Sequence, residues 1–266
     1  MIERLTMQSY RENAGVELKV VADLAEIGVA AAFQFTNRAA ASIQNTGRFA
    51  VALSGGATPC ALFGPLAQDR GAGLDWQNIH VFWGDERCVP PYSVASNYLM
   101  AKEQLLDHVP IPAANVHRIH TEEPASVAAS EYEAELRRFF KPTPGAWPRF
   151  DLLLLGVGED GHTASLFPAT AALREDVHMV ARNFVLSLNA ERITLTFPTI
   201  NAAACVLVLA SGAGKSAIVR SVLDTSPEIE ALPMQGVRPR DGRLLWLLDA
   251  AAAADLSTLA GAIAPN

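Results

Sequence analysis

A repeated alternation between short β-forming apolar runs and longer helical patterns constrains the fold of this chain most. The apolar runs are VELKVV (16–21), RFAVAL (48–53), IHVFW (79–83), DLLLLG (151–156), RITLTF (192–197), CVLVLA (205–210) and LLWLL (244–248). Between them, residues 22–45 and 126–140 place apolar side chains at helical spacing. Strands that alternate with helices predict βαβ units. We therefore expect an α/β fold of Rossmann-like type, with a mainly parallel sheet flanked by helices.

The chain is long enough for one large α/β domain, and half of its 266 residues are apolar. Residues 141–148 (KPTPGAWP) are rich in Pro and Gly and could form a linker between two domains. The strand–helix rhythm continues unchanged after them, so we interpret them as a surface loop. The prediction is a single domain over residues 1–266.

Composition excludes several classes of protein. The net charge of −7 argues against nucleic-acid binding, which needs clustered Lys and Arg. No apolar run reaches the ~20 residues of a membrane span, and the N-terminal MIERLTMQSYREN lacks the apolar region of a secretion signal. The cysteines are three and lie far apart, which favours neither disulfides nor a zinc site. We expect a cytoplasmic protein.

Chemically rich turns follow four of the apolar runs. They are SGGATP (54–59), GDER (84–87), GVGEDGH (156–162) and SGAGK (211–215). Because the carboxyl ends of parallel strands share one edge of a sheet, these turns should meet there, where α/β proteins bind ligands. Turn geometry alone accounts for the glycines, but it accounts poorly for Arg87, His162 and Lys215.

The first and last of these turns are suited to a phosphate group. In SGGATP, backbone N–H groups at Gly55 and Gly56 can turn toward an anion, and Ser54 and Thr58 add hydroxyl groups. The turn SGAGKS resembles a nucleotide P-loop, but Leu209 occupies the position of its first glycine, and the loop is too short to wrap a triphosphate. The lysine of this turn can still reach a single phosphate as a point charge.

The turn GDER begins with two carboxylates and an arginine at the end of a strand. On an extended chain Asp85 and Arg87 point to the same side, so both could face a cleft while Glu86 faces away. Ser96 and Asn97 indicate the start of the next helix. A surface salt bridge combined with a helix cap is the alternative interpretation.

The turn after DLLLLG contains Gly156-x-Gly158-x-x-Gly161, the spacing of a dinucleotide-binding fingerprint. That fold needs a long helix at the third glycine, yet Pro168 follows seven residues later. The acidic Glu159–Asp160 pair would also repel a pyrophosphate. We therefore predict no NAD site and interpret the glycines as a tight turn that presents His162 as a general base. A structural, hydrogen-bonded histidine is the alternative.

Two further histidines, His117 and His120, lie in the segment HRIH. Neither has a carboxylate or cysteine at a spacing typical of metal ligands, so we predict no metal site.

The motifs together, in this order, resemble the 6-phosphogluconolactonases of the glucosamine-6-phosphate isomerase/6-phosphogluconolactonase family. They are SGGATP, WGDERCVP with SNY, GVGEDGHTASLFP, ERITLTFPTIN, GAGKSAI and LPMQGVRP with GRLLWLLDAAAA. The resemblance runs from about Val20 to Ala253. It implies a single-domain α/β fold similar to glucosamine-6-phosphate deaminase and ribose-5-phosphate isomerase. It also implies hydrolysis of 6-phospho-D-glucono-1,5-lactone to 6-phospho-D-gluconate in the oxidative pentose phosphate pathway, with a small-molecule sugar phosphate as partner and no metal or organic cofactor.

The resemblance also implies roles for individual residues. It suggests that the substrate phosphate is held by Gly55, Gly56, Thr58, Arg192 and Lys215. Arg87 would lie against the phosphate or the lactone, and His162 would be the catalytic base with Asp85 and Asp160 nearby. The sequence departs from the family pattern at Ala169, where FPAT replaces FPGT, and in RNFVLSLNAER, which lacks the prolines common before ERITLT.

Two other functions fit the same features. An aldose–ketose isomerase or amino-sugar deaminase could use Asp85 and His162 on this scaffold, although TASLFP favours the lactonase. A sugar-phosphate-binding module without catalysis is the other alternative. The sequence does not indicate the oligomeric state.

Overall fold

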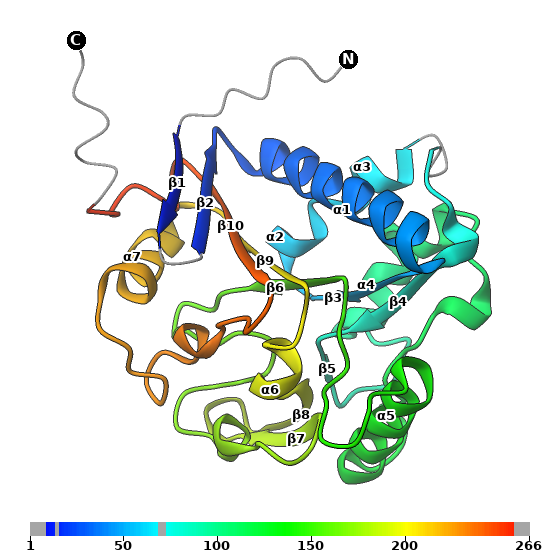
Figure 1. Ribbon diagram of the computed structural model, residues 1–266. Helices are drawn as coiled ribbons and strands as arrows, with labels where there is room; N and C mark the ends of the chain where they lie inside the picture. Colours follow the sequence, from blue (N-terminus) through cyan, green and yellow to red (C-terminus); the bar gives the residue numbers. More distant parts are fainter. Residues whose placement is uncertain (1–8, 14–15, 69–72, 258–266) are drawn as a thin grey trace.

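The computed structural model describes residues 9–13, 16–68 and 73–257, and within them a larger sheet has the strand order β1-β2-β10-β9-β6-β3-β4 (Figure 1). The strands are β1 (Ser9–Asn13), β2 (Val16–Val21), β10 (Arg243–Asp249), β9 (Cys205–Ala210), β6 (Leu152–Gly156), β3 (Phe49–Leu53) and β4 (Ile79–Trp83). All neighbours are parallel except β1 and β2, which are antiparallel. The predicted mainly parallel α/β fold is confirmed.

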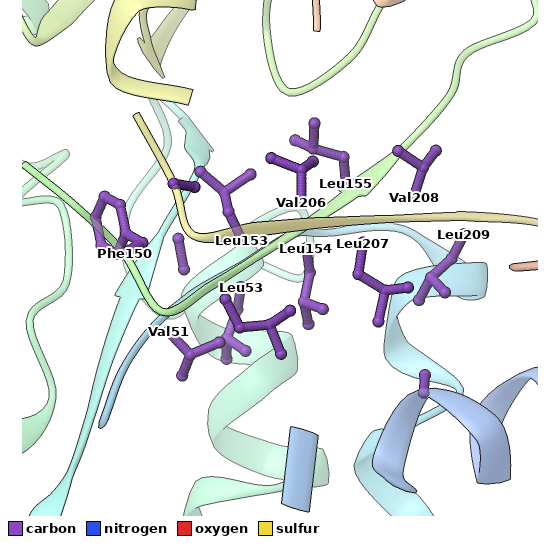
Figure 2. Close-up of a cluster of buried hydrophobic side chains, with 14 of the residues drawn as sticks. Val51, Leu53, Phe150, Leu153, Leu154, Leu155, Val206, Leu207, Val208 and Leu209 are labelled. Atoms are coloured by element: carbon purple, nitrogen blue, oxygen red, sulfur yellow. The ribbon is translucent and has the colours of Figure 1, made fainter. Parts of the chain in front are cut away.

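The central strands carry the hydrophobic core. Every residue of β3 and β9 is buried, as expected for strands that are covered on both faces. Figure 2 shows Val206 and Val208 on one side of β9 and Leu207 and Leu209 on the other. Burying one such side chain stabilises the fold by about 1.5–3 kcal/mol. The apolar runs of the sequence therefore fix these strands, which hold the turns at their carboxyl ends.

The longest helix, α1 (Leu24–Thr46), has a well-defined start and end. Asp23 caps its N-terminus by accepting a hydrogen bond from the Glu26 N–H at 2.9 Å. Gly47 ends it in the left-handed conformation, with φ of 79°. Where α1 meets α2 (Ala57–Cys60), a Cβ atom on Gly28 would lie 2.4 Å from the Ala61 carbonyl oxygen. The glycine therefore lets α1 lie close to the segment that follows β3.

Shorter helices connect the remaining strands. They are α3 (Phe63–Ala67), α4 (Asn97–Gln104), α5 (Ala125–Phe140), α6 (Phe197–Ile200) and α7 (Ser216–Asp224). Short 3-10 turns are η2 (Trp76–Asn78), η3 (Leu106–His108), η4 (Ala113–Asn115), η5 (Ala171–Arg174), η6 (Leu186–Leu188), η7 (Ala213–Lys215) and η8 (Pro233–Gly236). No helix in the described part of the chain is long and apolar enough to span a membrane.

A second, antiparallel sheet lies at the lower end of the molecule in Figure 1, with the order β5-β8-β7. Its strands are β5 (Asp85–Arg87), β8 (Ala190–Leu195) and β7 (Val180–Val185), and α5 packs beside them. The run RITLTF therefore does not join the parallel sheet as its apolar pattern suggested. It pairs instead with β7 in a hairpin, which η6 and the left-handed Asn189 close. This hairpin is the conformation of the proline-free segment RNFVLSLNAER.

Two loops noted in the sequence have defined conformations. Residues 141–148 contain no helix or strand and follow α5, whose C-terminus is capped by left-handed Lys141. Ala169 has φ of 57°, so the alanine of FPAT occupies the left-handed region that glycine usually takes. A left-handed conformation is thus compatible with alanine here, although it is less favourable than for glycine.

Candidate active site

A cleft of about 370 Å³ lies at the carboxyl ends of β9, β6, β3 and β4, which are neighbours in the sheet. Its lining residues come from all four turns that the sequence singled out. They are Ser54, Gly55, Gly56, Ala57, Thr58, Pro59, Asp85, Arg87, Asn97, Gly156, Val157, Gly158, His162, Ala164, Leu209, Ala210 and Lys215. Two expected site residues are not in this lining: Asp160 lies behind His162, and Arg192 lies beside Arg87.

The turn after β6 holds the imidazole of His162. The Gly158 N–H donates to the His162 carbonyl oxygen at 2.8 Å, and the Gly161 N–H donates to the Gly158 carbonyl oxygen at 3.0 Å. A Cβ atom on Gly158 would lie 2.0 Å from His162 Nδ1 and 2.6 Å from Asp160 Oδ1. The glycine therefore makes room for the imidazole and its carboxylate, and no dinucleotide-type helix follows Gly161.

Asp160 orients the imidazole. Its Oδ1 atom lies 2.5 Å from His162 Nδ1 and accepts the His162 backbone N–H at 3.1 Å. The ring of Phe167 stacks on the imidazole at a centroid distance of 4.1 Å. With Nδ1–H donating to Asp160, Nε2 of a neutral imidazole is a proton acceptor, and no described residue hydrogen-bonds to it. Asp160 therefore lies near His162, as the family resemblance implied, and the neighbouring carboxylate Glu159 has no hydrogen bond to the imidazole among the described residues.

Strand β5 separates its two carboxylates as the alternation of side chains predicted. Asp85 faces the cleft and is only 6% exposed, and this burial raises its pKa. Glu86 points the other way and caps α4, where it accepts hydrogen bonds from Ser96 Oγ and from the backbone N–H groups of Asn97 and Tyr98 at 2.7–3.0 Å. Glu86 is therefore structural, and it fixes the start of the helix that carries Asn97.

Two arginines lie opposite each other on β5 and β8. Arg87 lines the cleft, and its guanidinium donates to the Ala95 carbonyl oxygen at 2.5 Å. Arg192 is its partner in the strand register. Burial, together with the positive charge of Arg87, lowers the pKa of Arg192. An anion bound beside this pair would relieve their repulsion.

The turn after β3 offers unpaired backbone donors to the cleft. Among the residues that the structure describes, the N–H groups of Gly55, Gly56 and Ala57 form no hydrogen bond. Gly56 has φ of 94° and precedes the first turn of α2. A Cβ atom on Gly55 would lie 1.9 Å from Asn97 Oδ1, so this glycine also makes room for Asn97.

The turn after β9 is anchored by a residue that our sequence reasoning did not select. Asp249, at the end of the neighbouring strand β10, accepts hydrogen bonds from Ser211 Oγ at 2.5 Å and from the Gly212 N–H at 3.0 Å. These bonds fix the turn that brings Lys215 to the cleft. The place of Asp249 directly after the run LLWLL puts it at the same edge of the sheet, but the sequence does not indicate which residue it contacts.

The two cysteines Cys60 and Cys88 keep their thiols protonated near neutral pH. Cys60 ends α2 and is buried, which raises the pKa of its thiol to about 12. Burial also raises the pKa of Cys88 to about 11. Since the thiolate is the reactive form, neither cysteine is a nucleophile near neutral pH.

Two histidines outside the cleft, His80 and His117, form a separate chain of contacts. His117 Nδ1 lies 2.7 Å from Glu135 Oε1, and His117 Nε2 lies 3.1 Å from His80 Nδ1. The sequence does not indicate Glu135 as the partner of His117, because this carboxylate comes from α5, 18 positions further along the chain. Across the described ranges, no group of three His, Cys, Asp or Glu side chains is arranged to hold a metal ion.

This histidine chain predicts an acid-sensitive fold. Burial, together with the positive charges of nearby His117 and Arg48, lowers the pKa of His80 from 6.5 to about 4. The unfolded chain therefore binds a proton more readily, so the stability that neutral His80 provides is lost as pH falls from about 6.5 toward 4. Urea unfolding at about pH 7 and pH 5 should show a larger loss for the wild type than for His80→Gln, which cannot titrate. Parallel losses in the two proteins would contradict this expectation.

The fold and the cleft define a class: a parallel α/β protein with a small-ligand site at the carboxyl edge of its sheet. Residues 22–246 match the family described as glucosamine-6-phosphate isomerases/6-phosphogluconolactonase, and the chain belongs to this family.

Individual relatives agree with this assignment. The chain is 44% identical to a 6-phosphogluconolactonase of Nostoc sp. over 221 residues, which cover 81% of this chain and 88% of the relative. It is 41% identical to a 6-phosphogluconolactonase of Synechocystis sp., with 83% and 90% covered. The crystal structure of 6-phosphogluconolactonase from Leishmania guyanensis superposes with a TM-score of 0.80 at 30% identity, covering 88% of this chain and 96% of that chain.

Proposed function

We propose that this protein hydrolyses 6-phospho-D-glucono-1,5-lactone to 6-phospho-D-gluconate, as a single catalytic domain acting in the cytoplasm. One observation carries the proposal: His162, oriented by Asp160, shares a cleft with the unpaired N–H groups of the Gly55–Gly56 turn and with Lys215. Relatives at 41–44% identity that are named 6-phosphogluconolactonase support the same activity.

The phosphate end of the substrate is held by the turn after β3 and by Lys215. Backbone N–H groups at Gly55 and Gly56, the Thr58 hydroxyl and the lysine ammonium are donors that suit a phosphate dianion. Ser54 lies at the base of the same turn. Holding the phosphate fixes the place of the lactone carbonyl, and such positioning contributes several kcal/mol to catalysis. Arg192 would act from beside Arg87, as a second positive charge near the bound anion.

The chemical step begins at His162. Its Nε2 takes a proton from water while the water oxygen forms a bond to C1 of the lactone. The developing oxyanion needs a hydrogen-bond donor. The Gly158 N–H is already bonded to the His162 carbonyl oxygen, so we assign this role to Arg87, whose side chain lines the cleft. The bond from C1 to the ring oxygen then breaks, and imidazolium returns its proton to that oxygen. The product acid ionises and releases one proton.

The released proton gives the direct test of the activity. A pH-stat trace of freshly made 6-phosphogluconolactone should show acid release with the protein well above the spontaneous rate. Binding of the lactone without faster acid release would favour a sugar-phosphate-binding module. Release of ammonia from glucosamine 6-phosphate, with no effect on the lactone, would instead favour an amino-sugar deaminase.

Replacing Lys215 by alanine should act mainly on binding. We expect KM for the lactone to rise about 10- to 100-fold while kcat changes by only a few fold, because the lysine contacts the phosphate and not the reacting carbon. Lys102→Ala is the matched control, since Lys102 pairs with Asp107 at 2.7 Å and does not line the cleft. An unchanged KM for Lys215→Ala would remove the lysine from the phosphate site.

A further inference from the structure

The carboxylate of Asp85 lies at a junction of three segments of the cleft wall. Ser165, three residues after His162, donates from Oγ to Asp85 Oδ2 at 2.6 Å. Asn97, the first residue of α4, donates from Nδ2 to the Asp85 carbonyl oxygen at 2.9 Å and makes a longer contact of 3.4 Å to Oδ1. Strand β5, the His162 turn and α4 are thus tied together at one buried carboxylate.

Residues of the small antiparallel sheet hold Ser165 in place. The Ser165 backbone N–H donates to Thr194 Oγ1 at 3.2 Å, and the Ser165 carbonyl oxygen accepts from Asn183 Nδ2 at 2.9 Å. The side chain is buried, and Thr194 is the register partner of Asp85 on β8. The position of Ser165 therefore directs its hydroxyl to Asp85, not to solvent.

The side-chain amide of Asn97 turns its Nδ2 atom toward Asp85, and this orientation leaves its Oδ1 atom without a hydrogen bond. Asn97 Oδ1 is buried against Gly55 and has no hydrogen-bond partner among the described residues. An unpaired buried acceptor is unfavourable. The reversed amide would place Oδ1 against the carbonyl and carboxylate oxygens of Asp85, which is worse. The amide thus keeps a donor on the Asp85 side, where the backbone carbonyl accepts it and the longer contact to Oδ1 favours the carboxylate as an anion.

The geometry points to Ser165 and Asn97 as positioning residues that hold Asp85 as an anion in the cleft wall near His162. There the negative charge of Asp85 offsets the positive charge that the imidazole gains when it takes a proton from water. This inference rests on the proposed lactonase function. The sequence did not predict Ser165 or Asn97 as site residues. Both act on the reaction through Asp85.

The ionisation of Asp85 reflects opposing influences. Burial raises its pKa, whereas the Ser165 hydrogen bond and the positive charges of Arg87, His162 and Arg192 lower it. Glu86, the neighbouring carboxylate on β5, is the like charge beside it. Removing the Ser165 hydroxyl takes away the hydrogen bond that favours the anion. The pKa of Asp85 then rises further, and activity on the acidic side falls at a higher pH.

The test is the pH dependence of lactone hydrolysis by Ser165→Ala. We expect kcat to fall about tenfold, KM to stay within about threefold, and the acidic limb of the kcat profile to move up by about one pH unit. Ser165→Thr keeps the hydroxyl and should return the limb to its wild-type position. Asn97→Ala removes the other donor from a different element, so it should move the limb in the same direction even if Ser165→Ala folds poorly.

A matched control separates this role from a purely structural one. Ser42 Oγ donates to Asp151 Oδ1 at 2.5 Å, a bond of the same kind at the opposite end of β6 and outside the cleft. Ser42→Ala should lower stability and leave the pH profile unchanged. A wild-type profile in both Ser165→Ala and Asn97→Ala, or an equal shift in Ser42→Ala, would overturn the inference. A wild-type protein without lactone turnover would refute the proposed function itself.

Discussion

Replacing His162 by alanine is expected to lower kcat for lactone hydrolysis by about 10²- to 10⁴-fold, the range of a lost general base. The reason is the arrangement of its two nitrogens. Nδ1 is bound to Asp160 at 2.5 Å, and Nε2 is the proton acceptor of a side chain that lines the cleft. KM should change little, since the donors for the phosphate lie on the other turns.

The measurement for His162→Ala is a pH-stat assay corrected for spontaneous hydrolysis, with thermal unfolding as a check on the fold. His120→Ala is the control, because this exposed histidine lies outside the cleft. A His162→Ala protein that folds normally and keeps near-full kcat would exclude the imidazole from the reaction.

Replacing Gly158 by alanine is expected to have an effect on kcat of similar size, about 10²-fold or more, although no functional group is removed. The new Cβ atom would lie 2.0 Å from His162 Nδ1 and 2.6 Å from Asp160 Oδ1, so the pair cannot keep its geometry. Such a displacement of a catalytic base by about 1 Å is enough for a loss of this order.

Gly64→Ala is the control for this change. Gly64 lies in α3, and apart from its chain neighbours and its own helix backbone no heavy atom lies within 4 Å of the position that its Cβ would occupy. Its activity and fold should be preserved. If Gly158→Ala retained wild-type kcat, the contact between the imidazole and Asp160 would not matter for the reaction.

The sequence predicts the parallel sheet well, because its strands are buried on both faces and appear as short apolar runs. The same signal misplaced RITLTF, since an apolar run does not say which sheet a strand joins. The sequence did not indicate strand β7, because its buried residues are interrupted by exposed ones, such as the half-exposed Phe184, and form no continuous apolar run. Strand β1 lies in the polar N-terminal segment before the first apolar run, so no apolar pattern indicated it.

The candidate site was predictable where single turns carry their own chemistry, as at His162 and Lys215. It was less predictable where a role depends on contacts between distant segments. Asp249 and Ser165 contact Ser211 and Asp85 across 38 and 80 positions of sequence, and no local pattern indicates such pairs. The choice of Asp160 over Glu159 depended on the conformation of one turn.

The central claim is that His162 and the phosphate-binding donors act on opposite ends of one bound sugar. The most direct measurement compares kcat/KM for 6-phosphogluconolactone with that for the lactone without a phosphate, in the wild type and in Lys215→Ala. We expect the wild type to prefer the phosphorylated lactone by at least about 10²-fold and Lys215→Ala to lose most of that preference. Equal activity on both lactones in the wild type, or an unaltered preference in Lys215→Ala, would contradict this account of the cleft.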